Sequence, residues 1–313
     1  MTDLLGYAGF FGTTALTYAV ICLGLNLQWG QTGLFNVGIA GFVAIGAYTS
    51  AILTTPPGAH LGGFGLPIAA GWLGAMLLSG AASAAVGALT LRLRADYLAI
   101  TTFGIAVTVQ LVCLNSQSLT GGPFGIGFIP RPFADLATRP TAFSLAGLGL
   151  AVAVTALVYA ALQRLTDSPW GRVLRAIRDD ETAVEALGRS VTAFRLQSFA
   201  IGGAVMGLGG AMQAHAIGFI APDDYLPALT FQVWTMLIIG GAGSNAGAVL
   251  GAVAIWALWS ASGAAVTALV PPDLQARAAA LQLVAIGVVL SACLVLRPRG
   301  LLPRKGARRD LSA

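Results

Sequence analysis

The sequence is poor in charged residues, which make up 9% of its 313 residues, against about a quarter in a typical soluble domain. A soluble protein with so few charges could not cover its surface with polar groups, so lipid is the solvent that this composition suits. The 41 glycines agree, because glycine is frequent in membrane helices and lets them approach closely. We therefore expect an all-α polytopic membrane protein.

Cysteine and histidine are also scarce. Cys22, Cys113 and Cys293 lie far apart without a CxxC pair, and only two histidines occur. These cysteines and histidines do not have the spacing of metal ligands, so we expect neither a metal nor another cofactor. We interpret the cysteines as small buried side chains. The chain begins Met-Thr-Asp without a basic segment, which argues against a cleaved signal peptide.

Lysine occurs once, at Lys305, and no GxxxxGK[ST] motif surrounds it. A P-loop needs that lysine to reach the phosphates, so we do not expect this chain to hydrolyse ATP. The stretch GGAGSNAG at 240–247 lacks GxGxxG spacing and predicts a helix break or close packing. No group of acids, histidines and cysteines indicates catalysis, and no basic stripe interleaved with aromatics indicates a nucleic-acid partner.

Nine apolar stretches approach the length of about 20 residues that a membrane helix needs. They cover residues 5–25, 34–53, 66–91, 97–114, 143–162, 194–216, 226–240, 247–270 and 278–296. We expect nine membrane helices, within a range of eight to ten. The stretches at 34–53 and 226–247 are short or interrupted by glycine, which leaves open whether they are continuous, broken or re-entrant.

The charges between these stretches predict an orientation. No Asp, Glu, Lys or Arg occurs between Asp3 and Arg92. Basic residues follow the third stretch, separate the fifth from the sixth, and follow the ninth in a tail at about 297–313. Even numbers of spans separate these clusters, so all three share one side, which the positive-inside rule makes the cytoplasm. The N-terminus is then outside and the C-terminus cytoplasmic.

The loop at about 164–195 carries 11 of the 29 charged residues, 17 basic plus 12 acidic. Its stretch SPWGRVLRAIRDDETAVEALG, residues 168–188, predicts one amphipathic cytoplasmic helix of about five turns. Ser168 suits the N-cap, Pro169 the first helical position and Gly188 the C-terminal stop. Apolar residues recur along one side of this helix, namely Val173, Ile177, Val184 and Leu187.

Two interpretations of this helix are open. A solvated helix could lie on the membrane or on its own protein. Docking into a groove of another protein is favoured, because the charges are of both signs and a lipid anchor would have a mostly basic polar face.

The same stretch closely resembles the cytoplasmic segment of permease subunits of branched-chain amino-acid ABC importers, of the LivM type. Five further blocks resemble that family in order: GLNLQWGQTGLFNVGIAGFVAIGAYTSAIL (24–53), LRLRADYLAITTFG (91–104), SLTGGPFGI (118–126), IGGAGSNAGAVLGA (239–252) and LRPRGLLP (296–303). The chain departs from the family in its short tail after Pro303. The resemblance implies one permease domain over residues 1–313 in a bacterial cytoplasmic (inner) membrane.

In ABC importers such a loop is the coupling helix, which sits in a cleft of the ATPase subunit. The resemblance implies coupling residues at Ser168, Gly171, Arg172, Arg175, Arg178, Asp179, Glu181, Glu185 and Gly188. Glu185, Ala186 and Gly188 resemble a remnant of the importer EAA…G signature. The implied partners are a second, LivH-like permease, two cytoplasmic ABC ATPase subunits and an extracytoplasmic substrate-binding protein. The implied substrate is a branched-chain or related hydrophobic amino acid, with urea, amides and aromatic acids as alternatives.

The membrane stretches lack charges, which weighs against a proton-coupled carrier or an ion pump. A zwitterion has no net charge, so amides and helix ends could meet its two ends. Candidate residues for such a path are Asn26, Gln28, Gln31, Asn36, Thr101, Thr102 and Gln110, with interhelical hydrogen bonding as the alternative for each. Glycines nearby, including Gly30 and Gly33, would let backbones approach or a helix break. A sodium-coupled carrier for a small neutral solute is the competing class, because backbone carbonyls at broken helices can bind sodium.

Overall fold

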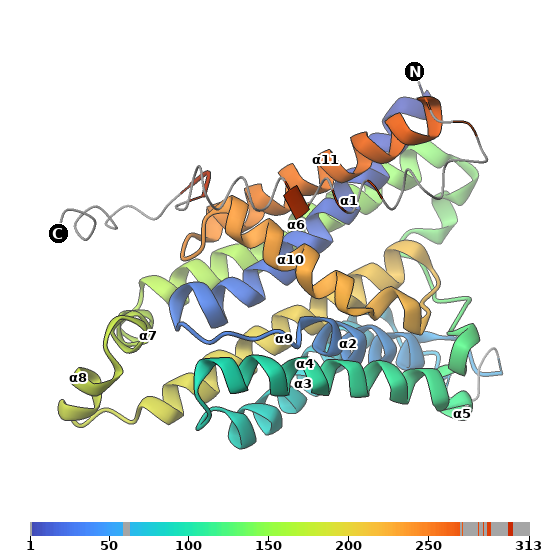
Figure 1. Ribbon diagram of the computed structural model, residues 1–313. Coiled ribbons are helices and arrows are strands. Elements are labelled where there is room, and N and C mark those ends of the chain that lie inside the picture. The colour runs from blue at the N-terminus through green and yellow to red at the C-terminus, as the bar shows by residue number, and fades with distance from the viewer. Residues whose placement is uncertain are drawn as a thin grey trace.

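A computed structural model of the protein describes residues 2–58, 63–269, 271, 281, 284, 287–288 and 300–302. Over these residues the fold is helical, without a β-strand, as the composition predicts (Figure 1). The α-helices are α1 (Thr2–Leu25), α2 (Ile39–Thr54), α3 (Ile68–Thr90), α4 (Ala95–Asn115), α5 (Gln117–Thr120), α6 (Pro140–Asp167), α7 (Pro169–Asp179), α8 (Glu181–Ala186), α9 (Val191–Ile217), α10 (Pro227–Gly240) and α11 (Asn245–Leu269). A π-helix, η1 (Asn26–Gln31), and the short 3₁₀ segments η2 (Gly122–Phe124), η3 (Ala134–Thr138) and η4 (Pro222–Tyr225) complete it.

Six of these helices are long and apolar enough to cross a membrane: α1 with η1, α3, α4, α6, α9 and α11. The other two apolar helices are shorter, with 16 residues in α2 and 14 in α10. At about 1.5 Å per residue they are shorter than the roughly 30 Å of a hydrocarbon core. Eight of the nine predicted stretches are therefore helices. The ninth, at 278–296, lies outside the described residues apart from 281, 284, 287 and 288, so the count of nine stays a prediction.

The second apolar stretch, residues 34–53, begins with non-helical backbone between α1 and α2. The α1 helix widens into η1, and residues 32–38 then run without helical structure until α2 begins at Ile39. Non-helical backbone at membrane depth persists only where protein covers it and satisfies its polar groups. Here the Val37 N–H donates to the Thr102 hydroxyl at 3.1 Å, and the Gly38 N–H donates to the Asn36 side chain at 2.7 Å.

The α9 helix lies at the centre of the bundle and packs against α1, α2 and α3 (Figure 1). The backbones of α2 and α9 touch at Gly46, where an added Cβ would overlap the backbone of Gly207. Next to this contact the rings of Phe42 and Phe199 pack edge to face, 5.8 Å apart. Small residues thus allow the close approach of membrane helices that the glycine content indicates.

The two ends of the bundle differ in charge. Helices α7 and α8 lie at one end together with the turn between α3 and α4, which carries Arg92 and Arg94 (Figure 1). Residues 300–302 lie at this end too, because the Leu301 N–H donates to the Ile239 carbonyl at 2.8 Å, near the end of α10. The N-terminus of α1 lies at the opposite end. The basic clusters at 92–94 and 164–195 therefore share one end, whereas the basic residues of the third cluster lie outside the described residues. The assignment of that end to the cytoplasm stays a prediction.

Candidate functional site

The charged loop between α6 and α9 folds into two helices, so the prediction of one continuous helix was wrong. Asp180 separates α7 from α8 with an extended backbone, at φ −156° and ψ 103°. Its carboxylate accepts a hydrogen bond from the Ala183 N–H at 3.0 Å and thereby caps α8. Aspartate favours this N-cap bond, which is available only outside the helical conformation. Helix α7 therefore ends at Asp179, because Asp180 caps α8 instead of continuing α7.

The predicted start and stop of the segment are confirmed in part. Pro169 occupies the first turn of α7, and Gly188 has the positive φ, +73°, that a helix stop requires. Ser168 holds the N-cap position, but its side chain does not cap α7. Its hydroxyl donates instead to the Leu165 carbonyl at 2.6 Å, at the end of α6. The serine therefore joins α6 to α7.

The apolar side of the loop is buried for only part of its length. Ile177 and Val184 form a small cluster with Val191 of α9, and Val173 packs against it. Leu187, which the pattern places on the same side, is 81% exposed. Leu187 follows the end of α8 at Ala186, so the buried side of the loop ends at Val184.

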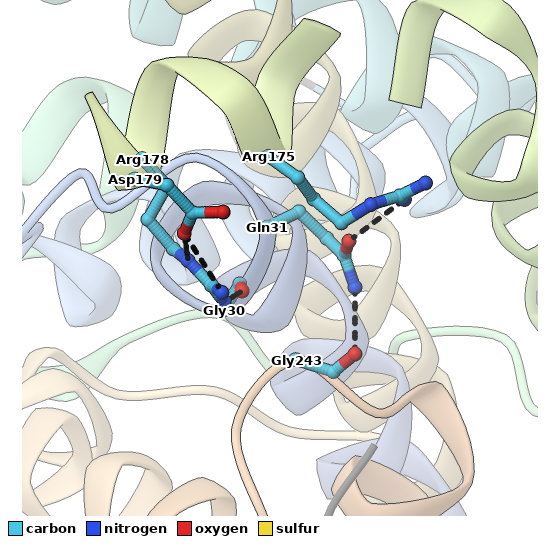
Figure 2. A network of polar contacts seen from close by, with 6 residues as sticks. All are labelled: Gly30, Gln31, Arg175, Arg178, Asp179 and Gly243. Atoms are coloured by element: carbon cyan, nitrogen blue, oxygen red, sulfur yellow. Dashed lines mark hydrogen bonds and ion pairs between the residues drawn. The ribbon is translucent and has the colours of Figure 1, made fainter. Parts of the chain in front are cut away.

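Two arginines of α7 point toward the membrane helices (Figure 2). Arg178 Nη1 donates to the Gly30 carbonyl at 2.6 Å. Arg175 Nη1 donates to the Thr166 carbonyl at 2.7 Å and makes a longer contact, 3.5 Å, with Gln31 Oε1. Gly30 and Thr166 lie in the last turns of η1 and α6, where exposed carbonyls and the helix dipole favour a cation. These bonds fasten α7 to two membrane helices.

The loop between α10 and α11 joins the same contact. Gln31 Nε2 donates to the Gly243 carbonyl at 2.8 Å, and the Gly243 N–H donates to Asn26 Oδ1 at 2.8 Å. Asn26 Nδ2 donates in turn to Asn245 Oδ1 at 2.8 Å. All of these side chains are buried. Gln31 thus lies between Arg175 on one side and this loop on the other (Figure 2).

Three glycines, Gly30, Gly33 and Gly243, lie beside the Arg178 side chain, which is 40% exposed, and we call them the glycine socket. A Cβ on Gly33 would lie 3.0 Å from Arg178 Cγ, and one on Gly243 would lie 3.5 Å from Arg178 Nη1. A Cβ on Gly30 would lie 2.5 Å from the Gly243 nitrogen. Gly33 and Gly243 also have positive φ, +78° and +84°, which other residues rarely adopt. The closest approach to the arginine is at Gly33, whereas a side chain on Gly30 would meet the Gly243 backbone instead.

The remaining predicted coupling residues divide into two groups. Arg172, Asp179 and Glu185 are exposed, and the Asp179 carboxylate pairs with the neighbouring Arg178, whose Nη2 donates to Asp179 Oδ1 at 3.2 Å (Figure 2). Glu181 pairs with Arg195 of α9 through two bonds of 2.7 and 2.6 Å, which ties α8 to the bundle. Gly171 is buried, and an added Cβ there would overlap the backbone of Thr166. The loop therefore has an anchored inner side and a charged outer side.

The predicted path residues lie mostly inside the subunit. Asn26, Gln28, Gln31, Asn36 and Thr102 are buried, Gln110 is 9% exposed and Thr101 is half-buried. Gln28 Nε2 donates to the Phe199 carbonyl at 2.8 Å, and Gln28 Oε1 accepts from Asn36 at 2.7 Å. These bonds fit the alternative that the polar residues form hydrogen bonds between helices. Their role in a translocation path stays a prediction.

Two residues of α10 that the sequence did not single out complete this polar region. Thr230 accepts the Ala40 N–H at 3.1 Å, and the Trp234 indole N–H donates to the Asn36 carbonyl at 3.1 Å. A cavity of about 260 Å³ lies near the glycine socket, lined by Gln31, Gln163, Thr166, Asp167, Ser244 and Asn245 among others. Within the described part of the chain, no three His, Cys, Asp or Glu side chains gather as metal ligands would.

Known proteins resemble this chain over most of its length. A family described as "Branched-chain amino acid transport system / permease component" matches residues 7–294. The high-affinity branched-chain amino acid transport system permease protein LivM of Salmonella typhimurium is 32% identical over 93% of this chain and 69% of that protein. A probable LivM of Methanocaldococcus jannaschii is 29% identical over 75% of each. The permease protein LivH of Escherichia coli is 24% identical, over 76% of this chain and 79% of its own. No solved structure gives a significant match.

Proposed function

Because the chain belongs to the family of branched-chain amino-acid transport permeases, we propose that it is the membrane-spanning permease subunit of an ABC importer. It forms half of a translocation path for branched-chain or related hydrophobic amino acids. The names of its LivM relatives support this substrate class. Hydrolysis of ATP takes place on partner chains.

The observation that carries this proposal is the two-sided arrangement of the loop helices. Arg175 and Arg178 fasten α7 to the membrane domain, while Arg172, Asp179 and Glu185 remain exposed. A helix held on one side and charged on the other suits the transfer of movement from a protein bound to its outer side. Rigid-body movement of a docked element is a common means of such transfer.

The proposed assembly contains a second, LivH-like permease, two cytoplasmic ABC ATPase subunits and an extracytoplasmic substrate-binding protein. The similarity to LivH supports a permease partner of the same family. Closure of the ATPase subunits pushes on α7 and α8. The loop and the C-terminus face the cytoplasm, and the N-terminus of α1 faces the outside.

Translocation requires the polar groups near α2 to exchange partners. The amides of Gln28 and Asn36 are engaged with each other and with the backbone of α9 in this conformation. A zwitterionic solute could replace these bonds when the helices separate, because amides can both donate and accept. Thr101 and Gln110 of α4 extend the same candidate path toward the outer end.

The test is reconstitution in liposomes with candidate ATPase, permease and binding-protein partners. We expect uptake of radiolabelled leucine that depends on ATP and stops when the ATPase subunits are omitted. Competition by unlabelled isoleucine, urea, amides and aromatic acids then identifies the substrate class. Uptake by the purified chain alone, driven by a sodium gradient without nucleotide, would support the carrier alternative and refute the importer.

A further inference from the structure

We propose that the glycine socket and Gln31 transmit the movement of α7 to the α10–α11 loop, and through α10 to the non-helical segment before α2. This inference rests on the proposed importer function and adds the route by which coupling reaches the membrane interior. It makes Gly33, Gly243 and Gln31 positioning residues, which act through Arg178 and Arg175.

The first step of the route is the seating of Arg178. Its side chain passes between Gly33 and Gly243, and its Nη1 lies 2.6 Å from the Gly30 carbonyl. The Arg178 side chain is 40% exposed, so the bond to the Gly30 carbonyl is its main hold on the bundle. A shift of α7 therefore either carries Gly30 with it or breaks this bond.

The second step is the bridge from η1 to the α10–α11 loop. Gln31 and Asn26 bond the carbonyl and the N–H of Gly243, each at 2.8 Å. The orientation of the Gln31 amide follows from its neighbours, since Arg175 can only donate and the Gly243 carbonyl can only accept. Movement of η1 therefore carries Gly243 with it.

The third step runs along α10 to the interior. This helix ends at Gly240, next to the loop, and it holds the segment before α2 through Trp234 and the first turn of α2 through Thr230. A helix of 14 residues is stiff over its length of about 21 Å. A displacement of the end of α10 next to the loop is thus passed to Asn36, in the non-helical segment, and to Ala40, in the first turn of α2. These residues lie among the candidate path residues.

The experiment measures uptake and ATP hydrolysis together, in vesicles that contain the complete complex. Gly33→Ala introduces a methyl group 3.0 Å from Arg178 Cγ at a residue with φ +78°. Its matched control is Gly58→Ala, which has a similar φ of +89° but no atom within 4 Å of the added group. Both variants suffer the same kind of backbone strain, so their difference isolates the socket.

A second pair of variants tests the bridge. Gln31→Met keeps the length of the side chain and removes both polar atoms. Its control, Gln197→Met, removes a different bond of α7, the one that Trp170 donates to Gln197 Oε1 at 2.7 Å. This bond links α7 to α9 and lies outside the proposed route.

We expect Gly33→Ala and Gln31→Met to lower the uptake per ATP hydrolysed by about tenfold, with ATP hydrolysis and complex assembly within about twofold of wild type. The two controls should keep the wild-type ratio. An unchanged ratio in both test variants overturns the inference. Failure of both to assemble also overturns it, because the socket would then serve folding alone.

Variants of the outer side separate this inference from the proposed function. Arg172→Glu and Glu185→Arg change exposed charges that do not touch the socket. If they uncouple the complex while the socket variants behave as wild type, the route is wrong and the importer function stands. If none of these variants alters uptake, the coupling role of the loop is itself refuted.

Discussion

The two ends of the bundle differ in the contacts that join segments far apart in the chain. At the end with α7, side chains of Arg175, Arg178, Gln31 and Asn26 make the contacts. At the opposite end, paired backbone bonds between Ile126 and Ile220, at 2.9 and 3.0 Å, hold two loop segments together. Side-chain bonds from Arg131 to the Ala216 carbonyl and between His215 and the Pro130 carbonyl lie beside them.

This difference indicates which end of the bundle can change its contacts more easily. Side-chain bonds can exchange partners through rotamer changes, whereas a backbone bridge breaks only if the chain itself moves. Ile126 and Ile220 are each 1% exposed, so water does not compete for the bridge. We infer a rigid outer end and an adjustable inner end.

The largest effect is expected from Gly125→Ala at the outer end. Gly125 has φ +68°, and an added Cβ would overlap the Ile220 carbonyl, so the bridge must open. We expect a loss of about 2–4 kcal/mol in the free energy of unfolding, measured as a lower midpoint of thermal unfolding in detergent. Gly127→Ala is the control, since its nearest neighbour, Phe219 Cδ2, would be 3.8 Å away. Equal midpoints in both variants would contradict a rigid outer end.

Arg175→Glu at the inner end should reduce transport more than stability. The new carboxylate would face the Thr166 carbonyl, which accepts a 2.7 Å bond from Arg175, so α7 loses an anchor. We expect about hundredfold slower uptake, equivalent to about 2.7 kcal/mol, with normal membrane insertion. Arg189→Glu makes the same charge change at an exposed residue and should leave uptake near wild type. Poor insertion of the Arg175 variant would show that the anchor serves folding.

Gly188→Pro should have a smaller effect on the same inner end. Proline requires φ near about −65°, whereas Gly188 has +73° and donates its N–H to Glu185 at 2.8 Å. We expect α8 to shift and uptake to fall by roughly tenfold to thirtyfold, about 1.4–2 kcal/mol. Gly188→Ala retains the N–H, and its Cβ meets no atom within 4 Å. A proline variant that transports no worse than the alanine variant would exclude a role for this turn.

The smallest effect is expected from the Glu181–Arg195 pair. Its side chains are 41% and 22% exposed, so solvent screening limits the pair to about 1 kcal/mol. Each of Glu181→Gln and Arg195→Gln should lower uptake by about twofold to fivefold, and the double variant no further. A double-mutant cycle of uptake rates at low and high salt measures the coupling. Additive losses would show that the two side chains act independently.

Several features of the fold could be predicted because their causes are local. The charge-poor stretches gave eight membrane-domain helices, and Pro169 and Gly188 marked the two ends of the loop segment. The short second and seventh stretches were recognised from glycine content and length. Such signals depend on neighbouring residues and need no knowledge of the tertiary structure.

Other features could not be predicted because they depend on distant partners. The glycine socket brings Gly30 and Gly33 next to Gly243, more than 200 positions away, and no spacing in the sequence indicates that contact. The break at Asp180 depends on a competition between capping and helix continuation that propensities do not decide. For the same reason, Arg175 and Arg178 could be assigned to the coupling loop, but not to its inner side.

The irregular segment before α2 has a consequence for how the protein is made. Its backbone groups and the first turn of α2 depend on Thr102, Thr230 and Trp234, which follow them in the chain by 65, 190 and 198 positions. Until the ribosome has produced α10, these groups lack their final partners and would be costly to expose to hydrocarbon. We therefore expect the early helices to enter lipid together with α10, because inserting them one at a time would expose these peptide groups to hydrocarbon without partners.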